Sequence, residues 1–382
     1  MNFIGDPQGG GRPKIILSAN TAWFLANFCS GLIRALREAG YEPIALAPRD
    51  PIAERSFREL EVQHFPVAVD RSGINPLSDL RLFGRYWTLI RQVRPAAYLG
   101  FTIKPNIYGS LAAASAGVVA LPTVTGLGTT FIRKNGPLHA LVARLYRAAF
   151  RQRPLVFFLN NEDADLFVGR RIVRRTQAHV LPGLGIDLDH FAPAPPAENS
   201  LTFLLVGRLL RDKGVGEFVE AGRRLQRRFP NARFQLLGPV DEGNRTAILA
   251  SELQSWVEEG VIEYLGEADD VRPLIAQASV VVLPSYREGM PRSLLEAAAM
   301  GRPLIATDVA GCRDIVEDGA NGYLCEVRDA GSLADTMQRM AELAPRQRQM
   351  MGERARKKVE EEFSEELVVR AYVDALKQLV SA

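Results

Sequence analysis

The chain has 382 residues, of which 47% are hydrophobic and 24% charged, which is enough apolar material for two compact domains. Its three cysteines, Cys29, Cys312 and Cys325, lie far apart and have no paired histidines nearby, which argues against a disulfide framework and a zinc site and favours a reducing compartment, the cytoplasm. The sequence shows neither a signal peptide nor an apolar run long enough to span a bilayer, so we expect a soluble or peripheral protein.

The net charge of +3 is distributed unevenly along the chain. Residues 1–190 hold 23 Lys and Arg against 14 Asp and Glu, whereas residues 191–382 hold 24 against 30. No acidic residue falls between Asp79 and Glu162, so this stretch should attract anions. Within it, segment 138–154 combines apolar residues at helical spacing with four arginines, a pattern typical either of a helix on an anionic membrane or of a half-exposed helix of a soluble domain. Nucleic-acid binding is disfavoured because interleaved aromatic residues and a known binding module are lacking.

Apolar runs alternate with segments of helical period along the first half of the chain, which predicts parallel strands joined by crossover helices. Strands are expected at residues 14–19, 42–48, 96–101, 121–125 and 155–160, and helices at 23–39, 77–93 and 106–117.

The second half repeats this pattern after a stretch rich in Pro, Ala and Asn at 192–199, which breaks both periods and is interpreted as the linker. Strands are expected at 202–207, 232–238, 261–266, 280–285, 303–308 and 322–326, and a last amphipathic helix at 364–380. The predicted fold class is therefore α/β, with two Rossmann-like doubly wound domains. Such sheets bind ligands at the carboxyl ends of their strands, which predicts a cleft between the two halves.

Residues 280–308 contain the most informative pattern in the chain: a strand, a loop with Glu288, a helix with Glu296, and a second strand. The residues that open a helix present backbone N–H groups and the positive end of the helix dipole, so a diphosphate can bind there. Gly289 allows the backbone to come close to such a ligand, and Pro291 is suited to a first helical turn. The two glutamates can then reach hydroxyl groups on either side of the diphosphate.

This segment resembles the E-x7-E signature of the retaining glycosyltransferases of family 4, which are nucleotide-sugar enzymes of the two-domain GT-B architecture. The resemblance includes the G-x-P-x-S-x-L-E core and the following G-x-P-x-I-A-T-D. It implies an N-terminal acceptor-binding domain at 1–190, a C-terminal nucleotide-sugar-binding domain at 191–363, and a helix at 364–382 that returns to the first domain. It also implies that Glu296 holds the ribose of the donor.

A second part of the resemblance follows the strand at 202–207, where Gly207-Arg208 and Lys213-Gly214 occupy the loop before the next helix. The family places an arginine and a lysine here to hold the donor diphosphate and to stabilise the charge of the departing nucleotide. The implied catalytic residues are Arg208, Lys213 and Glu288. The implied donor-binding residues are Gly207, Arg208, Lys213, Glu288, Gly289, Met290, Pro291, Leu295 and Glu296.

The strand-end loops of the first half are the predicted acceptor side. The first of them lacks the G-x-G-x-x-G of a dinucleotide site, which argues against an NAD enzyme. Backbone N–H groups of the third loop could cradle a phosphate. The acceptor-side candidates on these loops are Asn20, Thr21, Thr102, Lys104, Gly126 and Gly128.

The first two loops also carry an N-T-x-W run and a T-x-K-P-N-x-Y-G run. These resemble a subgroup that transfers N-acetylgalactosamine onto undecaprenyl-diphosphate-linked sugars. Many members of the broader family carry a histidine in the loop at 100–106, and this sequence has none there.

Two Asp-x-Asp triplets, at 163–165 and 187–189, match the metal-binding motif of the other major glycosyltransferase fold, but the first is interpreted as a helix start and the second lies at the crossover. No metal and no other cofactor are expected. The sequence thus predicts a retaining glycosyltransferase that moves an N-acetylhexosamine from a UDP-sugar to a polyprenyl-diphosphate-linked saccharide in polysaccharide or glycan assembly. An anionic membrane surface is a further candidate partner. The alternatives are a non-catalytic nucleotide-sugar sensor or scaffold, and an enzyme of the same architecture such as a sugar-nucleotide epimerase.

Overall fold

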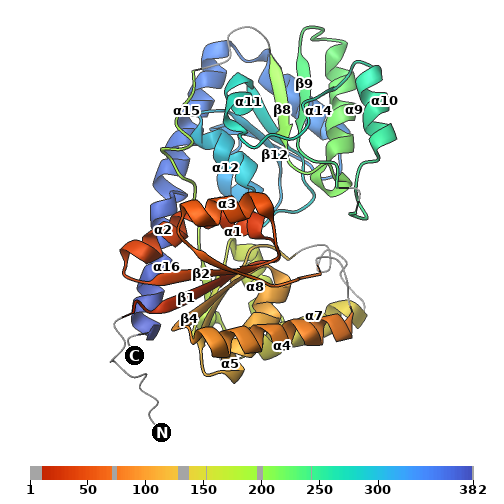
Figure 1. Cartoon of the computed structure of the whole chain (residues 1–382). Coiled ribbons are helices and arrows are strands. Elements are labelled where there is room, and N and C mark those ends of the chain that lie inside the picture. The colour runs from red at the N-terminus through yellow and green to blue at the C-terminus, as the bar shows by residue number, and fades with distance from the viewer. Residues whose placement is uncertain are drawn as a thin grey trace. The chain divides into compact units, whose positions relative to one another are not determined.

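The computed structural model describes residues 11–70, 75–127, 137–151, 153–195, 201–241 and 243–380. The chain divides into two compact units: unit 1 comprises Met1–Leu184 and Glu366–Ala382, and unit 2 comprises Gly185–Glu365. The division falls earlier in the chain than the expected one after residue 190, because Ile186 is fully buried in the core of unit 2 and its backbone is hydrogen bonded to Phe363 and Glu365. Each unit is a parallel sheet with helices on both faces (Figure 1).

In the described part of unit 1, seven parallel strands run in the order β3-β2-β1-β4-β5-β6-β7. They are β1 (Lys14–Ser18), β2 (Glu42–Ala47), β3 (Gln63–Pro66), β4 (Ala97–Phe101), β5 (Val119–Val124), β6 (Val156–Phe158) and β7 (Ala178–Val180). The helices are α1 (Ala22–Phe28), α2 (Ser30–Glu38), α3 (Pro51–Glu59), α4 (Pro76–Val93), the π-helix η1 (Pro105–Gly109), α5 (Ser110–Ser115), α7 (Pro137–Phe150), α8 (Asn161–Gly169), the 3₁₀ turn η2 (Arg175–Gln177) and α16 (Glu365–Val380).

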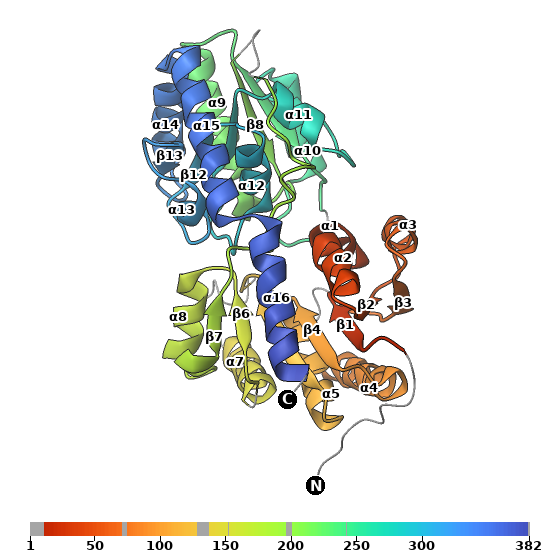
Figure 2. The ribbon, with the colours of Figure 1, turned by 90° about the vertical axis from the view of Figure 1, so that its left-hand side faces the viewer.

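The side chains of these strands alternate between two hydrophobic layers. Ile15 and Leu17 of β1 lie in the core that α1, α2, α3 and α16 cover, whereas Ile16 lies in the core that α4 and α5 cover. On this second face, β5 and β6 also contribute Val124 and Val156 to a cluster with α7 and α8. Figure 1 accordingly shows α1 to α3 on one side of the strands and α4, α5 and α7 on the other, and Figure 2 shows α16 running along the sheet of unit 1.

Two helices of unit 1 differ from the sequence expectation. The helix expected at 23–39 is interrupted at Cys29, whose φ of −119° and ψ of 8° are not helical, so that α1 and α2 are separate. The helix expected at 106–117 begins as a π-helix, in which the Asn106 side-chain amide donates to the carbonyl of Thr123 at 2.7 Å. This buried contact to β5 fixes the wider turn at the start of the helix.

In the described part of unit 2, six parallel strands run in the order β10-β9-β8-β11-β12-β13. They are β8 (Thr202–Val206), β9 (Arg233–Leu237), β10 (Glu263–Tyr264), β11 (Val280–Leu283), β12 (Leu304–Thr307) and β13 (Gly322–Cys325). The helices are the 3₁₀ turn η3 (Arg211–Lys213), α9 (Val215–Gln226), α10 (Ala250–Glu258), α11 (Arg272–Gln277), α12 (Arg292–Ala299), α13 (Cys312–Ile315), α14 (Ala330–Glu342) and α15 (Pro345–Glu362).

The strand order of unit 2 reverses direction between β8 and β11, which are neighbours in the sheet although β9 and β10 lie between them in the sequence. In open parallel sheets this switch point is where the loops at the carboxyl ends of adjacent strands diverge and leave room for a ligand. The loop after β8 and the loop after β11 therefore define the place to examine for a site. Among the described residues, no helix has the length and apolar character needed to cross a membrane.

Candidate functional site

The loops after β8 and β11 are tied together by hydrogen bonds. The carbonyl of Asp212, in η3, accepts from the backbone N–H of Tyr286 at 2.9 Å and from the hydroxyl of Ser285 at 3.1 Å. The backbone carbonyl of Ser285 accepts from the hydroxyl of Thr307 at the end of β12. The loops that follow three adjacent strands are thus held in one fixed arrangement.

This arrangement brings Lys213 and Glu288 into an ion pair between Nζ and Oε1. The two residues are 75 positions apart in the sequence, and their side chains are only 25% and 11% exposed. Ion pairs of this degree of burial depend on good geometry, because removing one partner leaves the other charge without compensation in a place that water reaches poorly. The structure thus joins the two sequence motifs that the resemblance assigned to one site.

Two glycines let these loops approach each other closely. Gly214 has a φ of 72°, and a Cβ at this position would lie 2.0 Å from the carbonyl oxygen of Pro284. Gly311, with a φ of 74°, follows β12, and its Cβ would lie 2.5 Å from the carbonyl oxygen of Gly289. Both contacts are too short for any side chain, and left-handed φ values favour glycine, so the backbone geometry around Glu288 requires these residues.

The helix α12 begins at Arg292, one residue later than the expected position of the first turn. Pro291 has a φ of −75° and a ψ of 110°, so it is the extended residue that precedes the helix. The N-terminus of α12 follows directly after Glu288, Gly289 and Met290, and it presents its dipole and its first N–H groups next to the Lys213–Glu288 pair. This is the environment that an anion requires.

Glu296 lies on the second turn of α12 and forms an ion pair with Arg292, with 3.0 Å between Oε1 and Nε. Burial raises the pKa of Glu296 above that of an ordinary glutamate, and the positive charge of Arg292 offsets part of this shift. Arg292 also donates to the carbonyl of Gly185 at 3.3 Å. The Glu296 carboxylate is thus held by a neighbour that the sequence reasoning had not identified.

Arg208 makes a different contact from the one expected for a group converging on Lys213. Its guanidinium pairs with Asp241, in the loop after β9, with 3.0 Å between Nη1 and Oδ2, and it is 56% exposed. The backbone N–H of the preceding Gly207 donates to the carbonyl of Leu237 at 2.9 Å. Arg208 therefore lies on the same loop as Lys213, but its side chain pairs with the neighbouring loop after β9, and this exposed side chain can reorient.

Leu295 and Met290 differ in how available they are to a ligand. Leu295 is only 2% exposed and packs in the core of unit 2, so its side chain is not accessible. Met290 is partly buried against the same core. Of the predicted donor residues on this segment, the side chains of Glu288 and Glu296 and the backbone near Gly289 remain the groups that can contact a ligand.

Cys312 lies close enough to this site for the charges of Glu288 and Lys213 to act on its thiol. Burial, and then the negative charge of Glu288, raise the pKa of the Cys312 thiol well above its ordinary value. The protonated, buried thiol is therefore inert. On the other side of the loop, the hydroxyl of Tyr286 donates to Glu217 at 2.6 Å, and the guanidinium of Arg328 lies 4.6 Å from its ring, so Tyr286 anchors the loop.

The acceptor-side candidates in unit 1 follow β1, β4 and β5. The N–H of Asn20 donates to the hydroxyl of Thr102 at 3.1 Å, which joins the first two loops, and Thr102 has a φ of 64°, a strained value for a β-branched residue. Thr21 is engaged as the N-cap of α1. Strain of this kind is retained where the surrounding structure enforces it, and it is concentrated at functional sites.

The remaining acceptor-side candidates are Lys104 and the two glycines of the third loop. Lys104 pairs with Asp79 at 2.7 Å, and the hydroxyl of Tyr108 donates to the same carboxylate at 2.9 Å, so the charge of this lysine is largely neutralised. Gly126 has a φ of 143°. Gly128 lies outside the described residues. The structure thus brings Asn20 and Thr102 together, while Lys104 is committed to a carboxylate.

Comparison with known protein families matches both halves of the chain. Residues 25–183 match the family described as "Glycosyl transferase 4-like domain", and residues 200–342 match "Glycosyl transferases group 1". The chain is a glycosyltransferase of the family 4-like group. The predicted donor motifs of this glycosyltransferase, from Arg208 to Glu296, all lie within the second match.

Two relatives of the glycosyltransferase are informative. The N,N'-diacetylbacillosaminyl-diphospho-undecaprenol alpha-1,3-N-acetylgalactosaminyltransferase of Campylobacter jejuni is 26% identical over 333 residues, which cover 83% of this chain and 86% of the relative. The UDP-Gal:alpha-D-GlcNAc-diphosphoundecaprenol alpha-1,3-galactosyltransferase of Escherichia coli is 27% identical over 285 residues, covering 70% and 72%.

Solved structures establish the fold of the glycosyltransferase. HepE of Anabaena in complex with UDP-glucose superposes with a TM-score of 0.80 at 17% identity, covering 96% of this chain and 100% of that one. A glycosyltransferase from Rickettsia africae superposes with a TM-score of 0.78 at 18% identity, covering 97% and 99%. The fold is therefore GT-B, as the sequence predicted.

Two residues of the site, Arg292 and Asp241, were missed by the sequence reasoning. Arg292 precedes Glu296 by four positions, the spacing at which oppositely charged side chains meet on a helix, and this signal was available. Asp241 follows β9, which lies next to β8 in the sheet, but it is surrounded by other polar loop residues. Only the strand order reveals that it faces Arg208.

Proposed function

We propose that this glycosyltransferase transfers an N-acetylhexosamine from a UDP-sugar to a hydroxyl group of a polyprenyl-diphosphate-linked saccharide, with retention of the anomeric configuration. The observation that carries the donor side of the proposal is the buried Lys213–Glu288 pair at the N-terminus of α12, with Glu296 on its next turn. The acceptor side is supported by the two relatives, whose names state that they act on undecaprenyl-diphosphate-linked sugars.

In this proposal the donor diphosphate binds at the N-terminus of α12, where backbone N–H groups and the helix dipole stabilise its negative charge. Lys213 supplies a positive charge from the loop after β8. When the bond between the sugar and the diphosphate breaks, negative charge builds up on the phosphate oxygen, and a preorganised cation stabilises it more than it stabilises the intact donor. Arg208 adds a second cation once its exposed side chain leaves Asp241.

The two glutamates have different tasks. Glu288 accepts hydrogen bonds from hydroxyl groups of the donor sugar, and its pairing with Lys213 fixes its position. Glu296 accepts from the ribose hydroxyls, and Arg292 fixes the orientation of its carboxylate. The first residue therefore acts on the reacting sugar, while the second contributes binding that is equal in the ground state and the transition state.

We infer that retention follows a front-face route. The bond from the anomeric carbon to the diphosphate oxygen breaks, the acceptor hydroxyl oxygen bonds to the same face of that carbon, and the departing phosphate oxygen takes the hydroxyl proton. UDP is thus released with the proton that the acceptor loses. This route requires no enzyme nucleophile, in keeping with the buried, protonated state of Cys312.

The reaction is proposed to need no metal ion, because Lys213, Arg208 and the N-terminus of α12 supply the positive charge that a metal supplies elsewhere. UDP release should therefore continue at an unchanged rate in excess EDTA. A loss of activity that added Mg²⁺ or Mn²⁺ restores would overturn this part of the proposal.

The test of the proposal is nucleotide release from a panel of UDP-, GDP- and ADP-sugars, each with and without a short polyprenyl-diphosphate-linked saccharide. Release of UDP from one N-acetylhexosamine donor, increased by the lipid-linked acceptor, is the expected result. Tight nucleotide binding without release under any pairing would favour a sensor or scaffold, and conversion of the donor to an epimer without an acceptor would favour an epimerase.

A further inference from the structure

One surface of unit 1 takes no part in the site described above. The helices α4, α5 and α7 lie in one layer over the sheet, with α5 packed between the other two (Figures 1 and 2). We call the outer, solvent-exposed side of α4 and α7 the α4–α7 face. Its residues are Leu77, Leu80, Arg81, Arg85, Trp87, Arg91 and Arg94 on or at the end of α4, and Leu141, Arg144, Ala148 and Arg151 on or at the end of α7.

The arginines of the α4–α7 face are not neutralised. Among the described residues, no carboxylate forms an ion pair or a hydrogen bond with Arg81, Arg85, Arg94, Arg144 or Arg151. The one carboxylate on α4, Asp79, is only 13% exposed and is already bound to Lys104 and Tyr108. Among the described residues, the exposed charged side chains of the α4–α7 face are therefore all positive.

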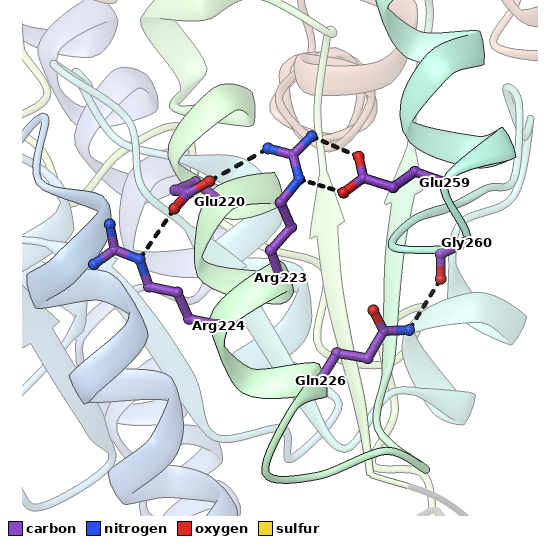
Figure 3. Close-up of polar contacts among 6 residues, drawn as sticks. All are labelled: Glu220, Arg223, Arg224, Gln226, Glu259 and Gly260. Atoms are coloured by element: carbon purple, nitrogen blue, oxygen red, sulfur yellow. Dashed lines mark hydrogen bonds and ion pairs between the residues drawn. The ribbon is translucent and has the colours of Figure 1, made fainter.

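Arginines on the surface of unit 2 offer a contrast. Figure 3 shows Arg223 held between Glu259 and Glu220, with Arg224 pairing with the same Glu220. The absence of such carboxylates from the described part of the α4–α7 face points instead to an anionic partner.

The α4–α7 face also carries large apolar side chains that are exposed to solvent. Leu77 and Leu80 are each 66% exposed on the first turns of α4, and Leu141 is 45% exposed on α7. Trp87 is 37% exposed and lies beneath the guanidinium of Arg91, at 4.9 Å from its ring. Residues 77, 80, 84, 87 and 91 recur at the spacing that places them on one side of a helix. Leucine, tryptophan and arginine side by side are the side chains that enter the boundary between lipid headgroups and acyl chains.

We propose that the α4–α7 face docks the protein onto the surface of a bilayer that contains anionic phospholipids. The arginines contact lipid phosphates while Leu77, Leu80 and Trp87 enter the interface between headgroups and chains. Charge complementarity selects this occupant, because the face offers several unpaired cations spread over two helices and no carboxylate that a basic partner would need. This docking proposal rests on the proposed function, because a lipid-linked acceptor lies at a membrane surface and docking would bring the enzyme to it.

The test is sedimentation of the full chain with vesicles, without donor or acceptor. Vesicles with about 30 mol% phosphatidylglycerol should bind the protein, whereas pure phosphatidylcholine vesicles should bind it weakly, and about 0.5 M salt should release it, because surface charges are then screened beyond a few ångströms. R81E/R91E should lower the partition coefficient by roughly 600-fold, because it changes the charge by four units and each unit of charge near an anionic surface contributes about fivefold. W87A should lower it several-fold with the charge unchanged.

The matched control is R55E/R58E, which makes the same change of charge at exposed positions of α3, on the opposite side of the sheet. It should bind anionic vesicles as the wild type does. The inference is overturned if the wild type binds no vesicle of either composition, a result that would leave a protein partner as the occupant of the face. It is also overturned if R81E/R91E and R55E/R58E lose binding equally.

A failure of docking can be separated from a failure of the proposed function. With a short-chain, water-soluble acceptor, UDP release by R81E/R91E should equal that of the wild type, and with the acceptor embedded in anionic vesicles it should fall. Vesicle binding without UDP release from either acceptor would contradict the proposed function and leave the docking surface intact. Equal UDP release by R81E/R91E and wild type on vesicle-embedded acceptor would contradict the docking surface and leave the function intact.

Discussion

The two units share one folding pattern, but arginines of unit 2 differ from those of the α4–α7 face in unit 1. In unit 2, arginines such as Arg223 at the surface and Arg292 in the candidate site form ion pairs with carboxylates (Figure 3). In unit 1, the described arginines of the α4–α7 face have no such partners. Paired charges fix the position of a side chain, whereas unpaired charges remain available to a partner. This difference agrees with the two roles proposed above, in which unit 2 binds a small donor and the α4–α7 face of unit 1 contacts an extended anionic surface.

The ion pairs of unit 2 are themselves of two kinds, and the following predictions separate them. Lys213–Glu288 and Arg292–Glu296 are largely buried and lie on the loops and the helix at the switch point of the sheet. Arg211–Glu252 and the pairs of Arg223 are exposed. Only the first kind should affect catalysis when it is broken, because exposed pairs contribute little and are screened by solvent.

The largest effect is expected for Lys213→Ala, which removes a cation that acts on the departing diphosphate and leaves Glu288 without its partner. The kcat of UDP release should fall by roughly 10²- to 10³-fold, the range for loss of one preorganised group that stabilises transition-state charge. Arg211→Ala, two residues away in the same 3₁₀ turn, is the matched control, since Arg211 is 51% exposed and pairs only at the surface. Equal losses in the two variants would contradict the role of Lys213.

Glu296→Gln should raise the KM for the donor by about 10-fold to 100-fold with little change in kcat, because it weakens binding that is the same in the ground state and the transition state. Steady-state kinetics with varied donor concentration measure this division. A fall in kcat equal to that of Lys213→Ala would show that Glu296 acts in the transition state instead.

The affinity for the donor should also depend on pH through Glu296. Burial raises the pKa of Glu296, so the carboxylate form that accepts the ribose hydroxyls is lost as the pH falls through this raised pKa. The KM for the donor should therefore increase on acidification at a higher pH than an ordinary glutamate would cause, and Glu296→Gln should remove this dependence. An unchanged pH profile in the variant would assign the titration to another group.

Gly311→Ala should disturb the donor loop through the backbone. The new Cβ would lie 2.5 Å from the carbonyl oxygen of Gly289 at a φ of 74°, so the loop must shift, and we expect a loss of about 1–3 kcal/mol in unfolding free energy together with weaker donor binding. Gly301→Ala is the control, because Gly301 has a φ of 73° and no atom within 4 Å of its Cβ position. Thermal unfolding and UDP titration are measured for both variants. Both introduce a side chain at a positive φ, but only Gly311→Ala displaces Gly289, so the difference between the variants reports that displacement.

The smallest effect is expected for Arg223→Ala, which breaks the exposed group of Figure 3. The unfolding free energy should fall by no more than about 1 kcal/mol, and the kinetics of UDP release should not change. Denaturant unfolding measures the first quantity. A large loss of activity would show that the exposed pairs of unit 2 also support the site, and the distinction between the two kinds of pair would fail.

Much of the fold was readable from the sequence, because strands buried on both faces are continuous apolar runs and the helices between them have a clear period. The predicted GT-B fold is confirmed, and the resemblance assigned Glu288 and Lys213 to one site, in which the structure pairs them. The break between α1 and α2 was not predictable, because Cys29 has no chemistry that ends a helix. The helix α3 was missed although Asp50 and Pro51 form a readable start, in which the Asp50 side chain accepts from two backbone N–H groups.

The site was less predictable than the fold. Motif spacing identified the charged residues but not their partners, since ion pairs such as Arg208–Asp241 depend on which strands are neighbours in the sheet. The same limit applies to Lys104, whose contact with Asp79 joins two segments that are 25 residues apart. The sequence shows that segment 80–161 lacks acidic residues, but only the structure shows that α4 presents exposed leucines and a tryptophan beside these arginines.

The measurement that tests the account most directly is the anomeric configuration of the product formed from a UDP-linked α-N-acetylhexosamine, determined by proton NMR of the purified saccharide. A site that combines Lys213, Glu288 and the N-terminus of α12, with Cys312 protonated and buried, predicts an α-linked product and UDP in equal amounts. A β-linked product would contradict the front-face route and the roles assigned to these residues.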